Sequence, residues 1–102
     1  MNRGEIWLAQ VGHKLRPVLV LTRNEVIDVR LMVTVAEITT SLRGISPEIA
    51  FDYHAAGLSQ RSVINCDGLH TVTKASLSDY VGAVEEVTLQ SVCRGVSHAL
   101  GC

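Results

Sequence analysis

The sequence predicts a mainly β, α+β fold in which a small β-barrel carries an amphipathic C-terminal helix. Valine, isoleucine and threonine are abundant, and these β-branched residues favour strands over helices. Short apolar runs follow one another too closely for helical crossovers between them, so we expect a largely antiparallel, curled sheet. The apolar period becomes helical only after residue 84.

Composition limits the class of protein. The 102 residues are 47% hydrophobic and 19% charged, which predicts one globular domain over residues 1–102. No apolar run approaches the roughly 20 residues that cross a bilayer, and the N-terminus lacks the layout of a signal peptide. Cys66, Cys93 and Cys102 lack zinc-binding spacing, so we expect free thiols in a reducing compartment. These features predict a cytoplasmic protein without a metal or another cofactor.

The net charge of −1 argues against a surface that attracts nucleic acid as a whole. Proteins that bind a duplex through its phosphates usually carry a strongly basic balance. A nucleic-acid site on this chain would therefore have to be a local patch.

The first part of the chain predicts two strands and a short irregular or helical stretch. Residues 5–9 form an apolar run that is typical of a strand, and residues 10–15 read as a polar loop. Residues 16–22 form the second strand. Its Pro17 fits a first or edge position because proline cannot donate to a sheet ladder. The irregular or helical stretch follows at residues 24–28.

The clearest strand is residues 31–39, a Val-rich run that ends in three consecutive hydroxyl residues. Four more short strands are predicted after it, which gives five to seven strands in all. They cover residues 47–52, 62–67, 69–73 and 80–84.

The last segment predicts a helix with one apolar face. Five residues share that face because they recur at helical spacing: Leu89, Val92, Cys93, Val96 and Leu100. Gly101 follows as a plausible residue for the left-handed end of the helix.

Candidate site residues lie at strand ends. The sequence has no Gly-rich phosphate loop, nucleophile elbow or zinc-protease motif, and its histidines are scattered. Arg16 precedes a buried-looking strand, and Thr39, Thr40 and Ser41 end another. Unaided, these residues read as a salt-bridged surface arginine and a capped turn. They also suit a phosphate, since arginine is a permanent planar cation and RNA supplies its own nucleophile, the 2′-hydroxyl.

Several motifs resemble, in order and over nearly the whole chain, the MazF/PemK toxins of type II toxin–antitoxin systems. The most specific pair is Arg3-Gly4-Glu5-Ile6-Trp7 with Arg16-Pro17-Val18-Leu19-Val20-Leu21. The others are Ile38-Thr39-Thr40-Ser41, residues 62–67, Leu69-His70-Thr71-Val72 and Tyr80-Val81-Gly82-Ala83-Val84.

The resemblance implies an SH3-like barrel of the PemK/CcdB type, usually a homodimer. It also implies a growth-arresting endoribonuclease that cuts single-stranded RNA without a metal, leaving 2′,3′-cyclic phosphate and 5′-hydroxyl ends. The substrate class is mRNA, with tRNA and rRNA as further candidates, and the partner is a MazE-like antitoxin. By position in the motifs, Arg16 and Thr39 are the implied catalytic residues.

The residues around this pair are RNA-contact candidates: Lys14, Thr40, Ser41, Asp67 and His70. Two departures from the family pattern lie where RNA would run. The loop at residues 10–15 is shorter than in many relatives, and Gly68 stands where a glutamine is common. Both bear on the cut-site sequence.

Two other functions compete with the nuclease. A CcdB-type gyrase poison shares the barrel but uses its terminal helix to bind a protein. An inactive SH3-like binding module is the third possibility. Only the nuclease requires Arg16 and Thr39 to share a groove.

Overall fold

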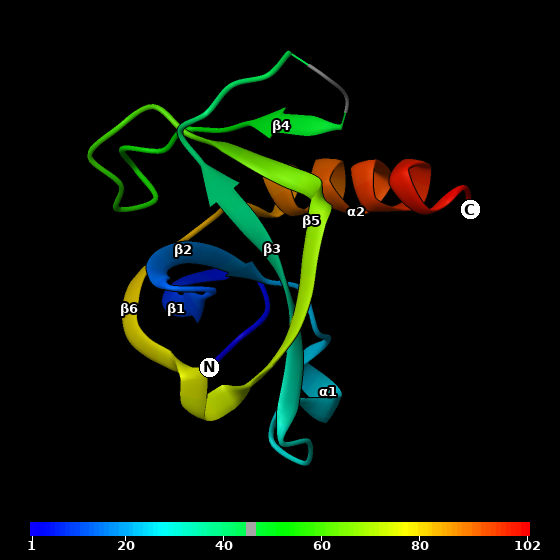
Figure 1. Cartoon of the computed structure of the whole chain (residues 1–102). Coiled ribbons are helices and arrows are strands. Elements are labelled where there is room, and N and C mark those ends of the chain that lie inside the picture. The colour runs from blue at the N-terminus through cyan, green and yellow to red at the C-terminus, as the bar shows by residue number, and fades with distance from the viewer. Residues whose placement is uncertain (45–46) are drawn as a thin grey trace.

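The computed structural model describes residues 1–44 and 47–102. In this described part of the chain, six strands precede a long C-terminal helix, and a short helix lies between the second and third strands (Figure 1). The elements are β1 (Glu5–Val11), β2 (Lys14–Val20), α1 (Asn24–Ile27), β3 (Met32–Thr39), β4 (Glu48–Ala50), β5 (Val63–Thr73), η1 (Lys74–Ser76, a 3-10 turn), β6 (Leu77–Ala83) and α2 (Glu86–Leu100).

The strands form one antiparallel sheet in the order β4-β5-β3-β2-β1-β6. The predicted mainly β, α+β class with a terminal helix is confirmed. The sheet curls but does not close, because within the described residues β4 and β6 are its two unpaired edges. The segment after β4 covers β6 instead: a Cβ on Gly82 would lie 2.0 Å from the Ala56 carbonyl oxygen, so only glycine allows this approach.

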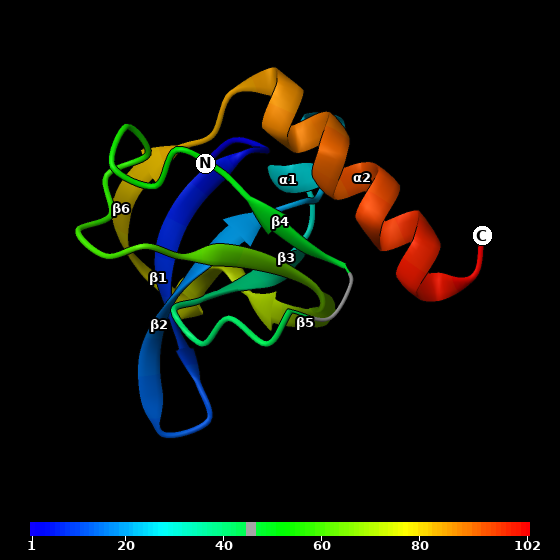
Figure 2. The same ribbon diagram turned by 90° about the horizontal axis from the view of Figure 1, so that it is seen from above.

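Two predicted boundaries are wrong. Residues 10–15 are not a loop, because β1 and β2 pair as far as Val11 and Lys14 and leave a tight turn at Gly12 and His13. The resulting β1–β2 hairpin projects away from α2 (Figure 2). The sequence did not predict that both strands extend into residues 10–15, because exposed polar side chains on a projecting hairpin resemble those of a loop.

The strands predicted at 62–67 and 69–73 are one strand, β5, which bends sharply (Figure 1). Glu37 of β3 pairs with Asn65, but the preceding residue, Ala36, pairs with Leu69. Residues 66–68 therefore form a bulge that turns the strand without ending it.

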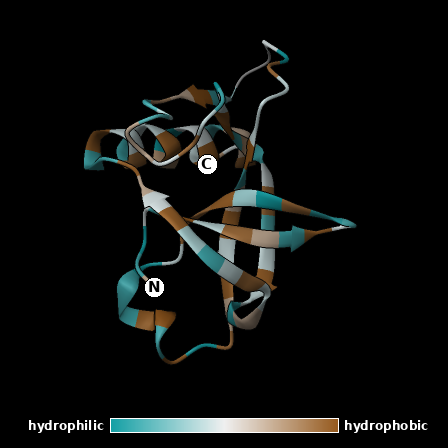
Figure 3. Cartoon of the chain, turned by 90° about the vertical axis from the view of Figure 1, so that its left-hand side faces the viewer, coloured by the Kyte–Doolittle hydropathy of each residue, from teal (hydrophilic) through white to brown (hydrophobic). Residues whose placement is uncertain are grey.

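Alternation along the strands divides the apolar residues between the two faces of the sheet. Hydropathy alternates accordingly along the strands and around α2 (Figure 3). One face carries Ile6, Leu19, Ala36, Ile38, Ile64 and Cys66, which form one core cluster with Leu89 and Val92 of α2. The other face carries Ala9, Val18, Val20, Val33, Val35 and Leu77, which form a second core cluster with Ile27 of α1.

The face of helix α2 that packs on the sheet differs from the face predicted by the sequence. Leu89 and Val92 are buried as expected, but Cys93 and Leu100 are exposed. The helix contacts the sheet through Gly95, where a Cβ would lie 2.7 Å from the Cys66 sulfur. Burial, with smaller contributions from Asp67 and Cys93, raises the pKa of the Cys66 thiol to about 11. Gly101 ends the helix in the left-handed conformation, as predicted.

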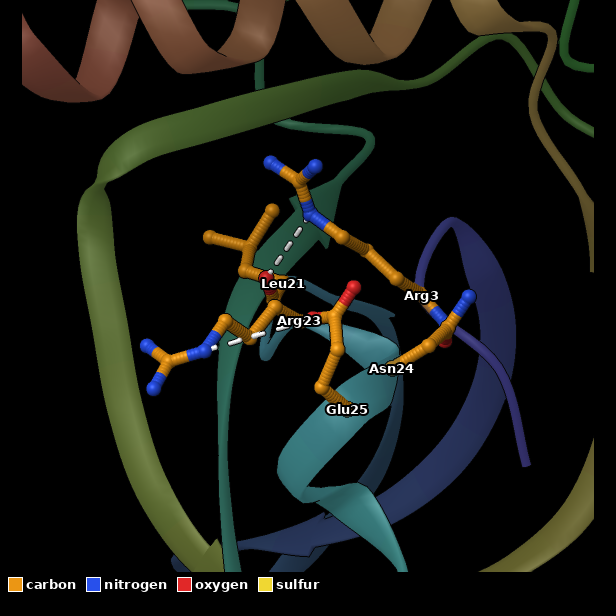
Figure 4. Close-up of polar contacts among 5 residues, drawn as sticks. All are labelled: Arg3, Leu21, Arg23, Asn24 and Glu25. Carbon is orange, nitrogen blue, oxygen red and sulfur yellow. Dashed lines mark hydrogen bonds and ion pairs between the residues drawn. The ribbon is translucent and has the colours of Figure 1, made fainter.

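Arg3 of the first motif connects the N-terminus to α1, to α2 and to the segment between β2 and α1. Its backbone N–H donates to Asn24 Oδ1 at 2.7 Å, and its Nε donates to the Leu21 carbonyl at 3.0 Å (Figure 4). Its Nη2 donates to the Cys93 sulfur of α2 at 2.8 Å. The motif arginine is therefore a structural clamp, while Arg16 stands elsewhere. Within the described residues, no helix is long and apolar enough to cross a membrane.

Candidate active site

The site lies where β2 and β3 separate. Their ladder ends at the pair Val18–Glu37. Continued by two residues, the same register would set Arg16 opposite Thr39. Side chains two residues apart share a face of a strand, so Glu37 and Thr39 continue the buried row of Val33 and Val35. The apolar face beside α1 thus becomes polar at its far end, on the side of the sheet opposite α2.

These residues line a cavity of about 290 Å³. Its walls come from the β1–β2 turn, the ends of β2 and β3, the loop after β3, and β4 and β5. The lining residues are Val11, Gly12, Arg16, Glu37, Thr39, Ser41, Arg43, Glu48 and Asn65. A second hollow shares Arg16, Thr39 and Ser41 with the first, so the two form one groove.

Of the residues predicted from the sequence, most meet in this groove. Arg16, Thr39 and Ser41 line both hollows, and Lys14 and Thr40 line the second. Asp67 is exposed on the bulge of β5 and does not line either hollow. His70 lies behind the first hollow, against Glu37.

Arg16 is available to an anion. Its side chain is half-buried, and among the described residues it forms no salt bridge. The competing interpretation as a salt-bridged surface arginine therefore has no support in the structure. A fixed backbone with a free guanidinium is the arrangement that binds a phosphate through two parallel hydrogen bonds.

Thr39 has both a structural and a chemical use. Its Oγ1 accepts the backbone N–H of Ser41 at 3.0 Å, so the capped turn expected from the sequence is present. That contact fixes the oxygen and leaves the hydroxyl hydrogen free to donate into the groove. The neighbouring carboxylate of Glu48 is already engaged, since it accepts the backbone N–H groups of Arg43 at 3.3 Å and Gly44 at 3.1 Å.

Sequence reasoning missed Glu37 and Asn65. Glu37 Oε2 lies 3.3 Å from Nε2 of His70, although the geometry is not that of a hydrogen bond. Nε2 is buried and has no partner among the described residues. The sequence carried one signal for Glu37: a lone carboxylate in the apolar run from Val33 to Ile38, two residues before Thr39. Asn65 carried none.

The described residues contain no group of three or more His, Cys, Asp and Glu side chains placed to hold a metal ion. The groove therefore offers a free guanidinium, hydroxyls and one uncommitted carboxylate. These groups can bind a phosphodiester and move protons around it. By fold and site, the chain falls in the class of small antiparallel β domains with a polar groove on the face opposite a terminal helix.

Comparison with known proteins places it within that class. The family model for the PemK-like, MazF-like toxins of type II toxin–antitoxin systems matches residues 2–100, and the chain belongs to this family. Among curated relatives, probable endoribonuclease MazF5 of Mycobacterium tuberculosis is 30% identical over 98% of this chain and 93% of its own. Endoribonuclease MazF3 of the same species is 43% identical over 76% of this chain and 73% of its own.

Solved structures agree. The Mycobacterium tuberculosis toxin MazF-mt6 is 34% identical, with a TM-score of 0.88 over 95% of this chain and 96% of its own. A mycobacterial endoribonuclease in complex with its cognate antitoxin is 26% identical, with a TM-score of 0.89 over 99% of this chain and 95% of its own. These relatives support the predicted toxin family and enzyme class, and they give no support to the gyrase-poison alternative.

Proposed function

We propose that this protein is the toxin of a type II toxin–antitoxin pair and cuts single-stranded RNA at selected sequences without a metal ion. One observation carries the proposal: the guanidinium of Arg16, which has no salt bridge among the described residues, and the fixed hydroxyl of Thr39 line the same groove. The endoribonuclease relatives named above support it. We expect mRNA as the main substrate, with tRNA and rRNA as further candidates.

The reaction uses the nucleophile that RNA carries. The 2′-hydroxyl attacks the adjacent phosphorus, the O2′–P bond forms, and the P–O5′ bond breaks. The products are a 2′,3′-cyclic phosphate and a 5′-hydroxyl. Such a cut needs alignment of the 2′-oxygen and stabilisation of charge on the phosphoryl oxygens, and both can come from a positioned side chain.

The groove residues divide these tasks. Arg16 stabilises the growing charge on the phosphoryl oxygens, and Thr39 donates a hydrogen bond to the same oxygens. Arg16 also takes part in proton transfer. It suits the acid half of the reaction, because a departing alkoxide is far more basic than guanidine. Lys14, Thr40 and Ser41 lie along the second hollow, where they can contact flanking nucleotides.

The proposed partners are a second copy of this chain and a MazE-like antitoxin. One structural relative was solved in complex with its cognate antitoxin, which supports an antitoxin here. We expect the antitoxin to cover the groove with a segment that orders on binding. Light scattering of the purified chain tests the homodimer: a mass near twice 11.0 kDa is expected.

The test of the activity is to map the ends of cellular RNA, tRNA included, after induction of the protein. We expect new 5′-hydroxyl ends at a common short sequence. The purified protein should make the same ends in EDTA, because neither the guanidinium nor the hydroxyl depends on a metal. Ends that carry a 5′-phosphate, or cutting that stops in EDTA, would contradict the mechanism.

A further inference from the structure

One carboxylate of the groove has no task in the scheme above. Glu37 and Glu48 both line the cavity, but Glu48 is held by the backbone N–H groups of the loop after β3. Among the described residues, Glu37 accepts no hydrogen bond, and its only contact at ion-pair distance is with His70. A free carboxylate beside a bound phosphodiester is electrostatically costly, so its presence calls for a chemical reason.

We propose that Glu37 is a further catalytic residue of this site, the general base that takes the proton from the attacking 2′-hydroxyl. The proposal rests on the proposed function. It assigns the removal of the 2′-hydroxyl proton, the base half of the reaction, which Arg16 performs poorly. An ionised carboxylate accepts protons, whereas a protonated guanidinium has no acceptor atom for one.

The fold makes room for this carboxylate at one particular point. A Cβ on Gly68 would lie 2.7 Å from Glu37 Oε2 and 3.0 Å from Asn65 Nδ2. Any side chain at position 68 would therefore collide with the carboxylate or force it to move. Because Gly68 belongs to the bulge of β5, the bend of that strand and the absent side chain together shape the space that Glu37 occupies.

His70 supports the carboxylate from behind. It pairs with Val35 in the sheet, and its buried Nε2, 3.3 Å from Glu37 Oε2, has no hydrogen-bond partner in the part of the chain that the structure describes. This distance is within hydrogen-bonding range, so it is the orientation of the two groups that departs from a hydrogen bond. We assign His70 as a positioning residue that acts on the substrate only through Glu37.

The step is balanced. The 2′-hydroxyl proton passes to the Glu37 carboxylate as the O2′–P bond forms. The P–O5′ bond breaks, and O5′ takes a proton from the Arg16 guanidinium. Water then returns the proton from Glu37 to Arg16, so both groups regain their starting forms. Other charged groups around Glu37 are Arg43 and Glu48 across the cavity.

The decisive variant is Glu37→Gln, which keeps the shape of the side chain and removes its basicity. We would measure kcat against pH on the oligoribonucleotide that end-mapping defines, and Kd for its uncleavable 2′-O-methyl analogue. We expect kcat to fall about 100- to 10,000-fold, the usual contribution of a general base, with Kd within about threefold. The wild-type loss of rate at acid pH should disappear.

Three further variants complete the design. Glu37→Asp should recover part of the rate, because it restores a carboxylate. His70→Gln should move the acid limb of the pH profile with a smaller loss of kcat, and an unchanged limb would remove His70 from the proposal. Glu25→Gln is the matched control, since Glu25 is exposed on α1 and away from the groove.

The outcomes separate this inference from the proposed function. If wild-type protein makes 5′-hydroxyl ends and Glu37→Gln does so at the same rate, the general-base role is overturned and the nuclease stands. A loss that appears in Kd and not in kcat would also overturn it, because Glu37 would then bind RNA without moving a proton. Wild-type protein that cuts no RNA would overturn both.

Discussion

At the scale of single residues, the proposed chemistry depends on two groups of the groove that remain available to a substrate, the Arg16 guanidinium and the Thr39 hydroxyl hydrogen. Arg16 forms no salt bridge among the described residues, and Thr39 uses only its oxygen on the local turn. A guanidinium already paired with a carboxylate would have to lose that partner before it could bind a phosphate. Leaving it unpaired means that less reorganisation is needed when charge grows on the phosphate.

This arrangement predicts the effect of removing each group. Arg16→Ala and Thr39→Ala should each lower the rate of RNA cutting by about 100- to 1,000-fold, the usual cost of losing one donor to a developing charge. Both should abolish growth arrest on induction. Arg16→Lys should recover little, because lysine lacks the planar fork, whereas Thr39→Ser should recover most of the activity.

Arg23→Ala serves as the control for loss of a cation. Arg23 is exposed, and its one ion pair within the described residues is the 4.0 Å contact with Glu25. It should retain full toxicity. The nuclease assignment would be wrong if Arg16→Ala and Thr39→Ala both arrested growth as strongly as wild-type protein while remaining folded.

At the scale of elements, β5 and α2 do most to shape the molecule. β5 bends at its bulge, so that its first part pairs with β4 and its second part continues along β3. The same bulge carries Cys66 toward α2 and Gly68 toward the groove. This one irregular segment therefore determines both where α2 packs on the sheet and how much space surrounds Glu37.

The contact between α2 and β5 gives a stability prediction. Gly95→Ala should gain about 1 kcal/mol of helix propensity but lose about 1–3 kcal/mol by overpacking, since its Cβ would lie 2.7 Å from the Cys66 sulfur. We expect urea denaturation to show a net loss. In a Cys66→Ala background the sulfur is gone, so the same substitution should be neutral or stabilising.

The two substitutions form a double-mutant cycle, which isolates the contact from helix propensity. Gly101→Ala offers a contrast, because a Cβ there would have no neighbour within 4 Å but would be strained at a φ of +76°. Its effect should not depend on residue 66. Additive effects of Gly95→Ala and Cys66→Ala would contradict the close packing described here.

At the scale of the whole molecule, the two faces of the sheet have different uses. The α2 face is closed by apolar packing, and the opposite face ends in the groove. The net charge of −1 means that no general field attracts RNA to the protein. For the proposed nuclease, we therefore expect binding to depend on the cations that line the groove among the described residues, which are Lys14, Arg16 and Arg43.

This charge distribution predicts a shallow salt dependence. Three cations on a single strand give a slope of about −2 in a plot of log affinity against log salt concentration, at about 0.7 per phosphate contact. Arg43→Ala should reduce the slope by about 0.7. Fluorescence anisotropy with the 2′-O-methyl oligonucleotide measures both values. A slope steeper than about −5 would show that cations outside the groove bind RNA.

The sequence by itself determined most of the fold. Apolar runs predicted the strands around Val18, Val35 and Ile64, and helical spacing predicted α2 with its end at Gly101. These patterns depend only on which residues must be buried away from water. The motif order also determined the family and placed Arg16 and Thr39 together. These are local properties that a single chain displays.

Tertiary structure decided what depends on neighbours far apart in the chain. The bulge that joins two predicted strands into β5, the approach of Gly95 to Cys66 and the open edge of the sheet all follow from packing between distant segments. Glu37 belongs to the same group. Its sequence position shows an isolated carboxylate, but only the bend of β5 brings Gly68 and His70 against it, because a strand's partners are set by register and not by its own residues.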